Sequence, residues 1–133
     1  MKKIFLILLL NILLFSKETY DRKTFQSAVF LNEIASSINE QLPMMIDKET
    51  RWDVAFGMKK NITYKYTLVN FNQKDFTAKQ IKDALKENIK NAVCTNPQIK
   101  IYPKNGVNMN YSYYSKDGKF MAEFTIRPKD CGF

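Results

Sequence analysis

The sequence predicts an α+β fold: a four- to five-stranded antiparallel sheet with two helices on one face, in the order α-ββ-α-(β)ββ. Three observations predict it. Two stretches carry apolar residues at three- and four-residue spacing, as amphipathic helices do. Two other stretches alternate apolar and polar residues on either side of a short turn, as β-hairpins do. The only two cysteines, Cys94 and Cys131, lie in the last part of the 133-residue chain.

Residues 1–16 form a predicted signal peptide in front of a single domain over residues 17–133. Lys2 and Lys3 precede an apolar run over residues 4–15 that only Asn11 interrupts. A helix of this length reaches about 18 Å, well short of a hydrocarbon core about 30 Å thick. The pattern is therefore typical of an export signal. Ser16 is the best small residue for cleavage, and an uncleaved membrane anchor is the alternative.

The first helix is predicted over residues 24–42. Its apolar stripe includes Ala28, Leu31, Ile38 and Leu42, at steps of three, four or seven residues. Pro43 ends it, because proline disfavours helical geometry in the residue before it. We interpret the stripe as the core face of the helix.

A β-hairpin is predicted after this helix. Its two apolar sets are separated by the polar turn at residues 59–61, and each is expected on one sheet face. The first set is Trp52, Val54, Phe56 and Met58, and the second is Ile62, Tyr64, Tyr66 and Leu68.

The second helix is predicted to begin near Thr77 and to end close to Cys94. Thr77 and Gln80 match a capping box, in which side chains satisfy the free amides of the first turn. Lysines follow one flank of this helix: Lys79, Lys82, Lys86 and Lys90. Such a charge run is typical of a solvated face, and it is also the most visible electrostatic feature of the sequence.

The last predicted element is a second hairpin around the turn Asp117-Gly118. An Asp-Gly pair suits the positive φ angles of tight hairpin turns. The alternating sets are Val107, Met109, Tyr111 and Tyr113 before the turn and Phe120, Ala122, Phe124 and Ile126 after it. Before this hairpin, residues 98–102 fit either a short strand or an irregular turn.

A disulfide between Cys94 and Cys131 is predicted from the compartment. An exported protein resides in an oxidising environment, where a lone pair of cysteines forms a bridge. Closing a loop of this length stabilises the fold by about 4 kcal/mol in the chain-entropy model. The alternatives are a metal site, which two thiolates without histidine make poorly, and a redox pair, whose C-x-x-C spacing is absent.

Several short motifs of this sequence resemble those of a known type of protein. The motifs are Cys94, Gly106-Val107, Tyr111-Ser112-Tyr113, Asp117-Gly118 and Cys131, together with residues 39–43, Ile46-Asp47 and Thr50. They are similar to those of a recurrent type of small exported bacterial α+β protein with a terminal Tyr-x-Tyr, Asp-Gly, Cys hairpin. The resemblance implies the fold and export. It also implies a helical turn after Pro97, where Ile99, Ile101 and Tyr102 depart from that expectation.

The sequence contains no catalytic constellation. It has no histidine, which removes the commonest general base and metal ligand. It has no glycine-rich phosphate loop and no nucleophile elbow. Paired carboxylates could come from Asp47, Glu49 and Asp53, but we expect ordinary exposed acids in a solvated loop. We therefore predict a protein that is not an enzyme and has no cofactor and no metal.

The formal net charge of +8 becomes +6 once residues 1–16 are removed. This charge favours acidic or anionic partners, whereas an exported protein rarely meets nucleic acid. The candidate binding surface comprises Lys82, Lys86, Lys90 and Tyr114. Tyr64, Tyr66, Tyr111 and Tyr113 could line a pocket, but their apolar neighbours favour packing in the core.

We predict a non-enzymatic accessory or binding protein of the bacterial envelope, periplasmic or secreted, that acts by contact with another envelope or secreted protein. Its subtypes are immunity, secretion-accessory and inhibitor proteins. The alternative is a binder of an anionic envelope component, a lipid headgroup or an acidic glycan, through the lysine-rich helix flank.

Overall fold

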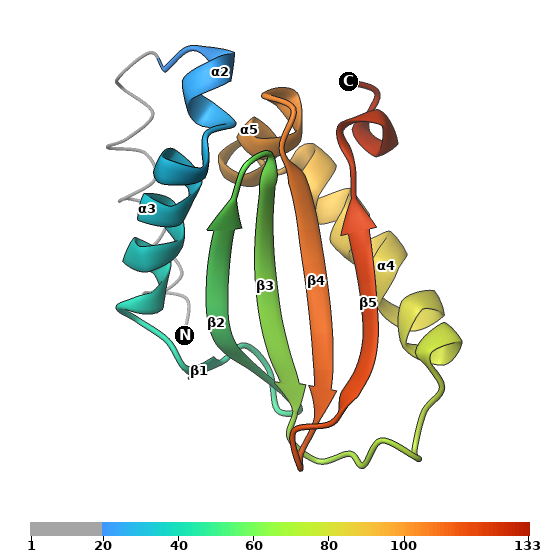
Figure 1. Cartoon of the computed structure of the whole chain (residues 1–133). Coiled ribbons are helices and arrows are strands. Elements are labelled where there is room, and N and C mark those ends of the chain that lie inside the picture. Colours follow the sequence, from blue (N-terminus) through green and yellow to red (C-terminus); the bar gives the residue numbers. More distant parts are fainter. Residues whose placement is uncertain (1–19) are drawn as a thin grey trace.

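The described part of the chain is a five-stranded sheet with helices on one side. A computed structural model describes residues 20–133. The strands lie side by side in chain order (Figure 1). Their bounds are Met44–Met45 (β1), Thr50–Met58 (β2), Asn61–Leu68 (β3), Asn108–Ser115 (β4) and Phe120–Ile126 (β5). The predicted signal peptide or anchor over residues 1–16 lies outside these described residues.

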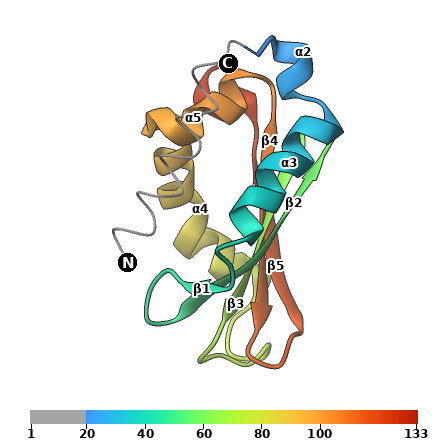
Figure 2. The ribbon, with the colours of Figure 1, turned by 90° about the vertical axis from the view of Figure 1, so that its left-hand side faces the viewer.

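The helices cover one face of the sheet and leave the other bare, as predicted. They are α2 (Arg22–Phe25), α3 (Ala28–Asn39), α4 (Ala78–Thr95), α5 (Pro97–Lys104) and the short 3-10 helix η1 (Pro128–Cys131). Of the two long helices, α3 packs along β2 and α4 packs on β5. Figure 2 shows both on the same side of the sheet. We call the opposite side the open face. Between residues 20 and 133, no helix is long and apolar enough to cross a membrane.

The helices begin at capping residues. In α4, the predicted capping box is present: the Thr77 hydroxyl accepts a hydrogen bond from the Gln80 amide at 3.1 Å, and the Gln80 side chain accepts one from the Thr77 amide at 2.9 Å. The predicted first helix over residues 24–42 is instead two helices. Ser27 interrupts it because its hydroxyl accepts a hydrogen bond from the Phe30 amide and so caps a new helix, α3.

The core lies between the sheet and the helices. Helix α3 contributes Leu31, Ile34, Ala35 and Ile38, and the inner face of the sheet contributes aromatic and aliphatic side chains from β2 to β5. Gly57 in β2 lies directly under α3. A Cβ atom there would come closer than 3.0 Å to the backbone of Leu31 and Asn32. The absence of a side chain therefore lets α3 approach the sheet.

The stretch over residues 98–102 is helical, so neither the strand nor the irregular turn that its residues suggested is present. It belongs to α5, where the Asn96 side chain accepts a hydrogen bond from the Gln98 amide and Pro97 occupies the first turn. Proline there has no amide to leave unpaired, which favours a helix start. The helical turn that the resemblance implied is correct. The fifth strand is β1, formed by Met44 and Met45.

The sheet is mostly antiparallel, but its central pair departs from the predicted all-antiparallel arrangement. β3 and β4 are parallel, with Tyr64 opposite Tyr111 and Tyr66 opposite Tyr113. A parallel pair needs a long crossover connection, usually a helix. Here α4 and α5 together supply it. Without a strand at residues 98–102 to reverse the chain, β4 runs in the same direction as β3.

Candidate functional site

A β-bulge turns part of β2 toward the open face. The pairing of β2 with β3 shifts between Trp52 and Val54, so that Trp52 and Ala55 both lie buried on the inner face. The predicted alternation placed Trp52, Val54, Phe56 and Met58 on one face. This was wrong, because the extra residue of a bulge inverts the alternation after it. Phe56 is consequently 47% exposed and Met58 66% exposed.

Asp53 is the extra residue of the bulge, and its carboxylate is fully engaged. One oxygen lies 2.5 Å from Arg51 Nε, and the other accepts a hydrogen bond from the Thr67 hydroxyl at 2.5 Å. These contacts bridge β2 and β3 on the open face. They give the sequence-predicted acid a structural role in the strand that presents Phe56.

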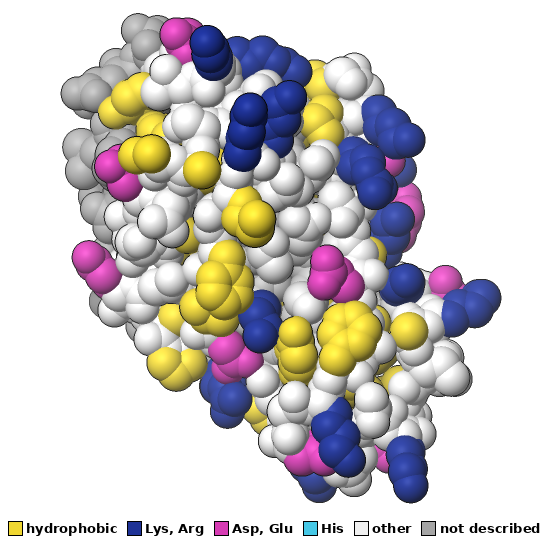
Figure 3. Space-filling view, viewed as in Figure 1, with side chains coloured by type: hydrophobic (Ala, Val, Ile, Leu, Met, Phe, Trp, Pro, Cys, Tyr) yellow, Lys and Arg dark blue, Asp and Glu magenta, His cyan; other side chains and the backbone are white. Residues whose placement is uncertain are grey.

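Four side chains meet beside this bulge, and we call them the open-face patch: Phe56, Lys65, Tyr114 and Phe120. Lys65 Nζ lies 4.3 Å from the ring centre of Tyr114 and 5.9 Å from that of Phe56. The rings of Tyr114 and Phe120 meet edge to face at 5.8 Å. Figure 3 shows hydrophobic side chains gathered on this side of the molecule, with basic and acidic side chains between them.

The open-face patch has the composition of a protein-binding surface. Phe120 is 49% exposed, like Phe56, so two phenylalanine rings meet solvent on a face without helices. Within residues 20–133, Lys65 forms no ion pair; its ammonium group lies over the rings of Tyr114 and Phe56 instead. Exposed apolar clusters with a polar rim mark interaction sites, and aromatic side chains are enriched in such interfaces.

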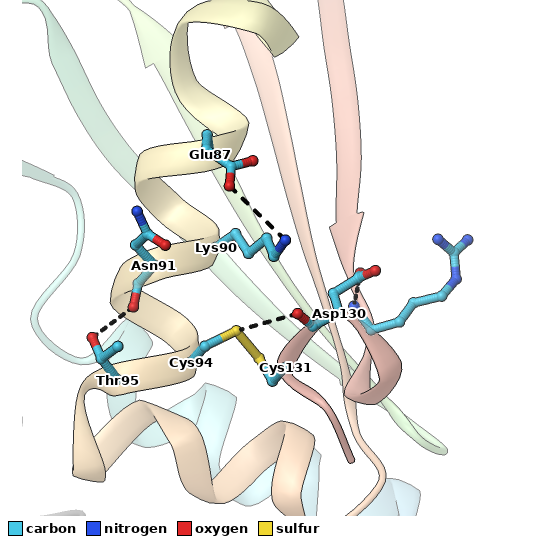
Figure 4. Close-up of a disulfide and its surroundings, with 8 residues drawn as sticks. Glu87, Lys90, Asn91, Cys94, Thr95, Asp130 and Cys131 are labelled. Atoms are coloured by element: carbon cyan, nitrogen blue, oxygen red, sulfur yellow. Dashed lines mark hydrogen bonds and ion pairs between the residues drawn. A yellow bond between two sulfur atoms is a disulfide. The ribbon is translucent and has the colours of Figure 1, made fainter.

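The structure separates the predicted binding residues into two places. Tyr114 lies half-buried in the open-face patch. Lys82, Lys86 and Lys90 lie on α4, on the other side of the sheet. Part of that lysine flank is neutralised, because Lys90 lies 3.9 Å from Glu87, as Figure 4 shows.

The four tyrosines on the inner face are core residues, as their neighbours predicted. Tyr64, Tyr66, Tyr111 and Tyr113 are all buried. Their rings form a continuous layer across β3 and β4, with Tyr66 stacked on Tyr113 at 5.1 Å. Burial raises the pKa of all four phenols well above the ordinary value, since the phenolate would lose its hydration.

The other two sequence-predicted acids, Asp47 and Glu49, lie in the turn before β2. Asp47 accepts hydrogen bonds from the amides of Glu49 and Thr50 at 2.8 and 2.7 Å, which closes the turn before β2. Glu49 is exposed in that turn. Within residues 20–133, no group of three or more histidine, cysteine or acidic side chains could hold a metal ion.

The predicted disulfide is present. Cys94 near the end of α4 is bonded to Cys131 in η1, with their Cα atoms 5.2 Å apart (Figure 4). The bridge closes a loop across 37 positions of the sequence and fixes the segment after β5 against the helices. It lies at one end of the molecule, away from the open-face patch.

Comparisons with known proteins agree with this fold. A family model described as a domain of unknown function, DUF8479, matches residues 26–122. No curated protein sequence matches the chain. Three solved structures share its fold, and they confirm the resemblance to small exported α+β proteins.

The first is PA3611 of Pseudomonas aeruginosa, which is thought to be secreted: it has a TM-score of 0.67 and 14% identity, over 85% of this chain and 99% of that one. The second is the type II secretion system pilotin AspS of Vibrio cholerae, with a TM-score of 0.62 and 13% identity, over 83% of this chain and 95% of that one. The third is EpsS, a pilotin of the type 2 secretion system of Vibrio vulnificus, with a TM-score of 0.66 and 11% identity, over 84% and 96%.

Proposed function

The chain belongs to the DUF8479 family, and from its pilotin-like fold and its open-face patch we propose that it is an exported accessory protein of a secretion or assembly machinery. It acts by binding another envelope protein. The disulfide and the likeness to PA3611 support a location outside the cytoplasm, periplasmic or secreted.

The observation that carries the proposal is the fold match combined with an exposed aromatic surface. The two pilotins match over 95% and 96% of their chains, so this domain has the size of a complete pilotin. The open-face patch offers two half-exposed rings, Phe56 and Phe120, with the ammonium group of Lys65 over the ring of Phe56, and a few such residues supply most of the binding energy in protein interfaces.

The carboxylates support this reading over catalysis. Asp53 is paired with Arg51 and Thr67, and Asp47 closes a turn, so both have structural partners. The names of the two pilotins describe parts of a secretion system. Contact with a protein is therefore the function that these surfaces fit best.

Photo-crosslinking in living cells tests the proposal. A photoreactive phenylalanine analogue is introduced at Phe56 or at Phe120, and for comparison at Val29, which is 71% exposed on α3. We expect the two patch positions to crosslink the same envelope protein and Val29 not to crosslink it. With that partner purified, Phe56→Ser combined with Phe120→Ser raises Kd by about thirtyfold or more, the loss typical of a hot spot.

Two results would contradict the proposal. One is an identical crosslinking pattern at all three positions, which would mean collision rather than binding. The other is an unchanged Kd for the double variant, whose folding is checked by circular dichroism. The second result would remove the open-face patch from the interface even if a partner exists.

A further inference from the structure

Basic side chains gather at one end of the molecule, which we call the basic end. Here α2, the turn between β2 and β3, α5 and η1 come together, at the top of Figure 1. Backbone and side-chain contacts hold them: Arg22 Nη1 donates to the Lys104 carbonyl at 3.0 Å, and the Lys60 amide donates to the Gln26 carbonyl at 2.8 Å. The basic residues are Arg22, Lys23, Lys59, Lys60, Lys100, Lys104, Arg127 and Lys129.

This end carries the entire excess of positive side-chain charge in residues 20–133. Among residues 20–133, the acidic side chains at the basic end are those of Asp21 and Asp130, against eight basic ones. In the rest of these residues ten bases face ten acids. The charge of the domain is therefore not spread over its surface but concentrated at one end, where dark-blue side chains dominate in Figure 3.

Most of the basic side chains at this end can meet an external anion; Arg22 also donates to the Lys104 carbonyl, and Lys100 Nζ lies 5.7 Å from the ring centre of Phe133. Seven of the eight are exposed, and Lys100 is half-buried. The ion pairs found in residues 20–133 all lie elsewhere and involve none of the eight. Both acids are engaged with backbone: Asp21 caps α2 through the Thr24 amide, and Asp130 accepts a hydrogen bond from the Arg127 amide.

The apolar N-terminal run leads to this same end. Only Asp21, the capping residue, separates Tyr20 from α2, which belongs to the basic end. Only residues 16–19 separate Tyr20 from the apolar run over residues 4–15, a length of at most about 14 Å when fully extended. In the alternative in which this run is retained as a membrane anchor, the basic end is the part of the described domain to which it connects.

We propose that the basic end binds the surface of an anionic phospholipid bilayer. Cations near such a surface are attracted by its negative potential, and each contributes independently. The short connection to an apolar run favours lipid over an acidic glycan or an acidic protein as the occupant. This inference does not rest on the proposed function, because the open-face patch and the basic end are different surfaces.

Binding to lipid vesicles tests the proposal. The protein recovered from the cell envelope is mixed with vesicles of phosphatidylcholine, with or without about one-third phosphatidylglycerol. The test variant combines Lys23→Gln, Lys59→Gln and Lys129→Gln, whose side chains make no hydrogen bond or ion pair within residues 20–133. The matched control combines Lys82→Gln, Lys86→Gln and Lys90→Gln, which removes the same charge from the flank of α4.

We expect the basic-end variant to bind anionic vesicles about a hundredfold more weakly than the unmodified protein, at about fivefold per cation. The α4 variant should change by less than about threefold. Affinity for anionic vesicles should also fall steeply between low and physiological salt, since mobile ions screen the attraction. Any contribution from a retained apolar anchor appears equally with neutral vesicles and is subtracted.

Three outcomes would overturn the proposal. Equal losses in the two variants would mean that net charge alone matters. A larger loss in the α4 variant would place the anionic site on the helix flank. Equal binding of the unmodified protein to neutral and anionic vesicles, or tight binding to a polyanionic glycan with none to anionic vesicles, would exclude the bilayer as the occupant. In each case a crosslinked partner at the open-face patch would stand unaffected.

Discussion

Replacing Gly57 with alanine should cost this domain much of its stability. The added methyl group would come closer than 3.0 Å to the carbonyl carbon and oxygen of Leu31 and to the amide nitrogen of Asn32. These atoms belong to the middle of α3 and cannot yield separately. The whole helix must therefore shift away from β2, which loosens the contacts of buried residues such as Ile34 and Ile38.

The expected loss is about 3 kcal/mol, at the upper end of the range for overpacking in a core. Urea unfolding measures it: with a slope of about 1.5 kcal/mol/M, the midpoint falls by about 2 M. The matched control is Gly118→Ala, where a Cβ would meet no atom within 4 Å but φ is +80°. That change costs about 1 kcal/mol for left-handed backbone alone.

The difference in unfolding free energy between the Gly57→Ala and Gly118→Ala variants measures the contribution of the contact between α3 and β2. A loss for Gly57→Ala no larger than that for Gly118→Ala would refute the close approach of helix and sheet. The fluorescence of Trp52, which is buried in β2, provides a second probe of the same transition. Its midpoint should coincide with that of circular dichroism if the domain unfolds in one step.

The disulfide and the tyrosine layer lead to two further predictions. Replacing Cys94 and Cys131 together with serine should lower the free energy of unfolding by about 4 kcal/mol, measured as a lower urea midpoint, and a reductant should reproduce it in the unmodified protein. The phenols of Tyr64, Tyr66 and Tyr111 have native pKa values above the unfolded value of about 10. The free energy of unfolding that these buried phenols contribute should therefore be fully present below pH 10 and decrease as the pH rises above it. The absorbance of phenolate should appear together with unfolding.

The sequence predicted those parts of the fold that depend on local periodicity. The strand pairs of both hairpins, the capping box at Thr77 and the disulfide were correct because each follows from spacing or from the compartment. Register shifts at Trp52/Val54 and at Tyr113/Tyr114 moved Phe56 and Phe120 off the faces that the alternation gave them. The bulge at Asp53 could not be predicted in this way. The feature that marks the bulge is the contact of the Asp53 carboxylate with both Arg51 and Thr67. Thr67 lies on the neighbouring strand, so this contact is known only once the register of β2 and β3 is known.

The candidate site depended on that bulge, so sequence reasoning found only part of it. Tyr114 was recognised because it falls out of phase with the apolar residues before it. Phe56 was placed on the same sheet face as Trp52, since a strict two-residue alternation groups the two. Lys65 gave no signal in the sequence, because its importance comes from the rings of Tyr114 and Phe56, which belong to other strands.

The helical turn after Pro97 shows the opposite case, in which a resemblance predicted more than local patterning. Ile99, Ile101 and Tyr102 suit a strand by composition. The Asn96 cap and the proline at the first helical position outweigh that preference, and burial of Tyr102 fixes the helix in the core. The consequence reaches the centre of the sheet, where β4 enters parallel to β3.

The two proposed surfaces can be occupied at the same time. β3 begins at Asn61, beside the basic end, and Lys65 lies four residues further along it. At about 3.3 Å per residue, Lys65 lies about 13 Å from that end of the sheet. Tyr114 is opposite Thr67, at about 20 Å. Phe56, opposite Thr63, is the patch residue nearest to that end, at about 7 Å. A bilayer that contacts only the basic end would therefore leave the rings of Tyr114 and Phe120 uncovered, and a protein bound there would be held at the membrane surface.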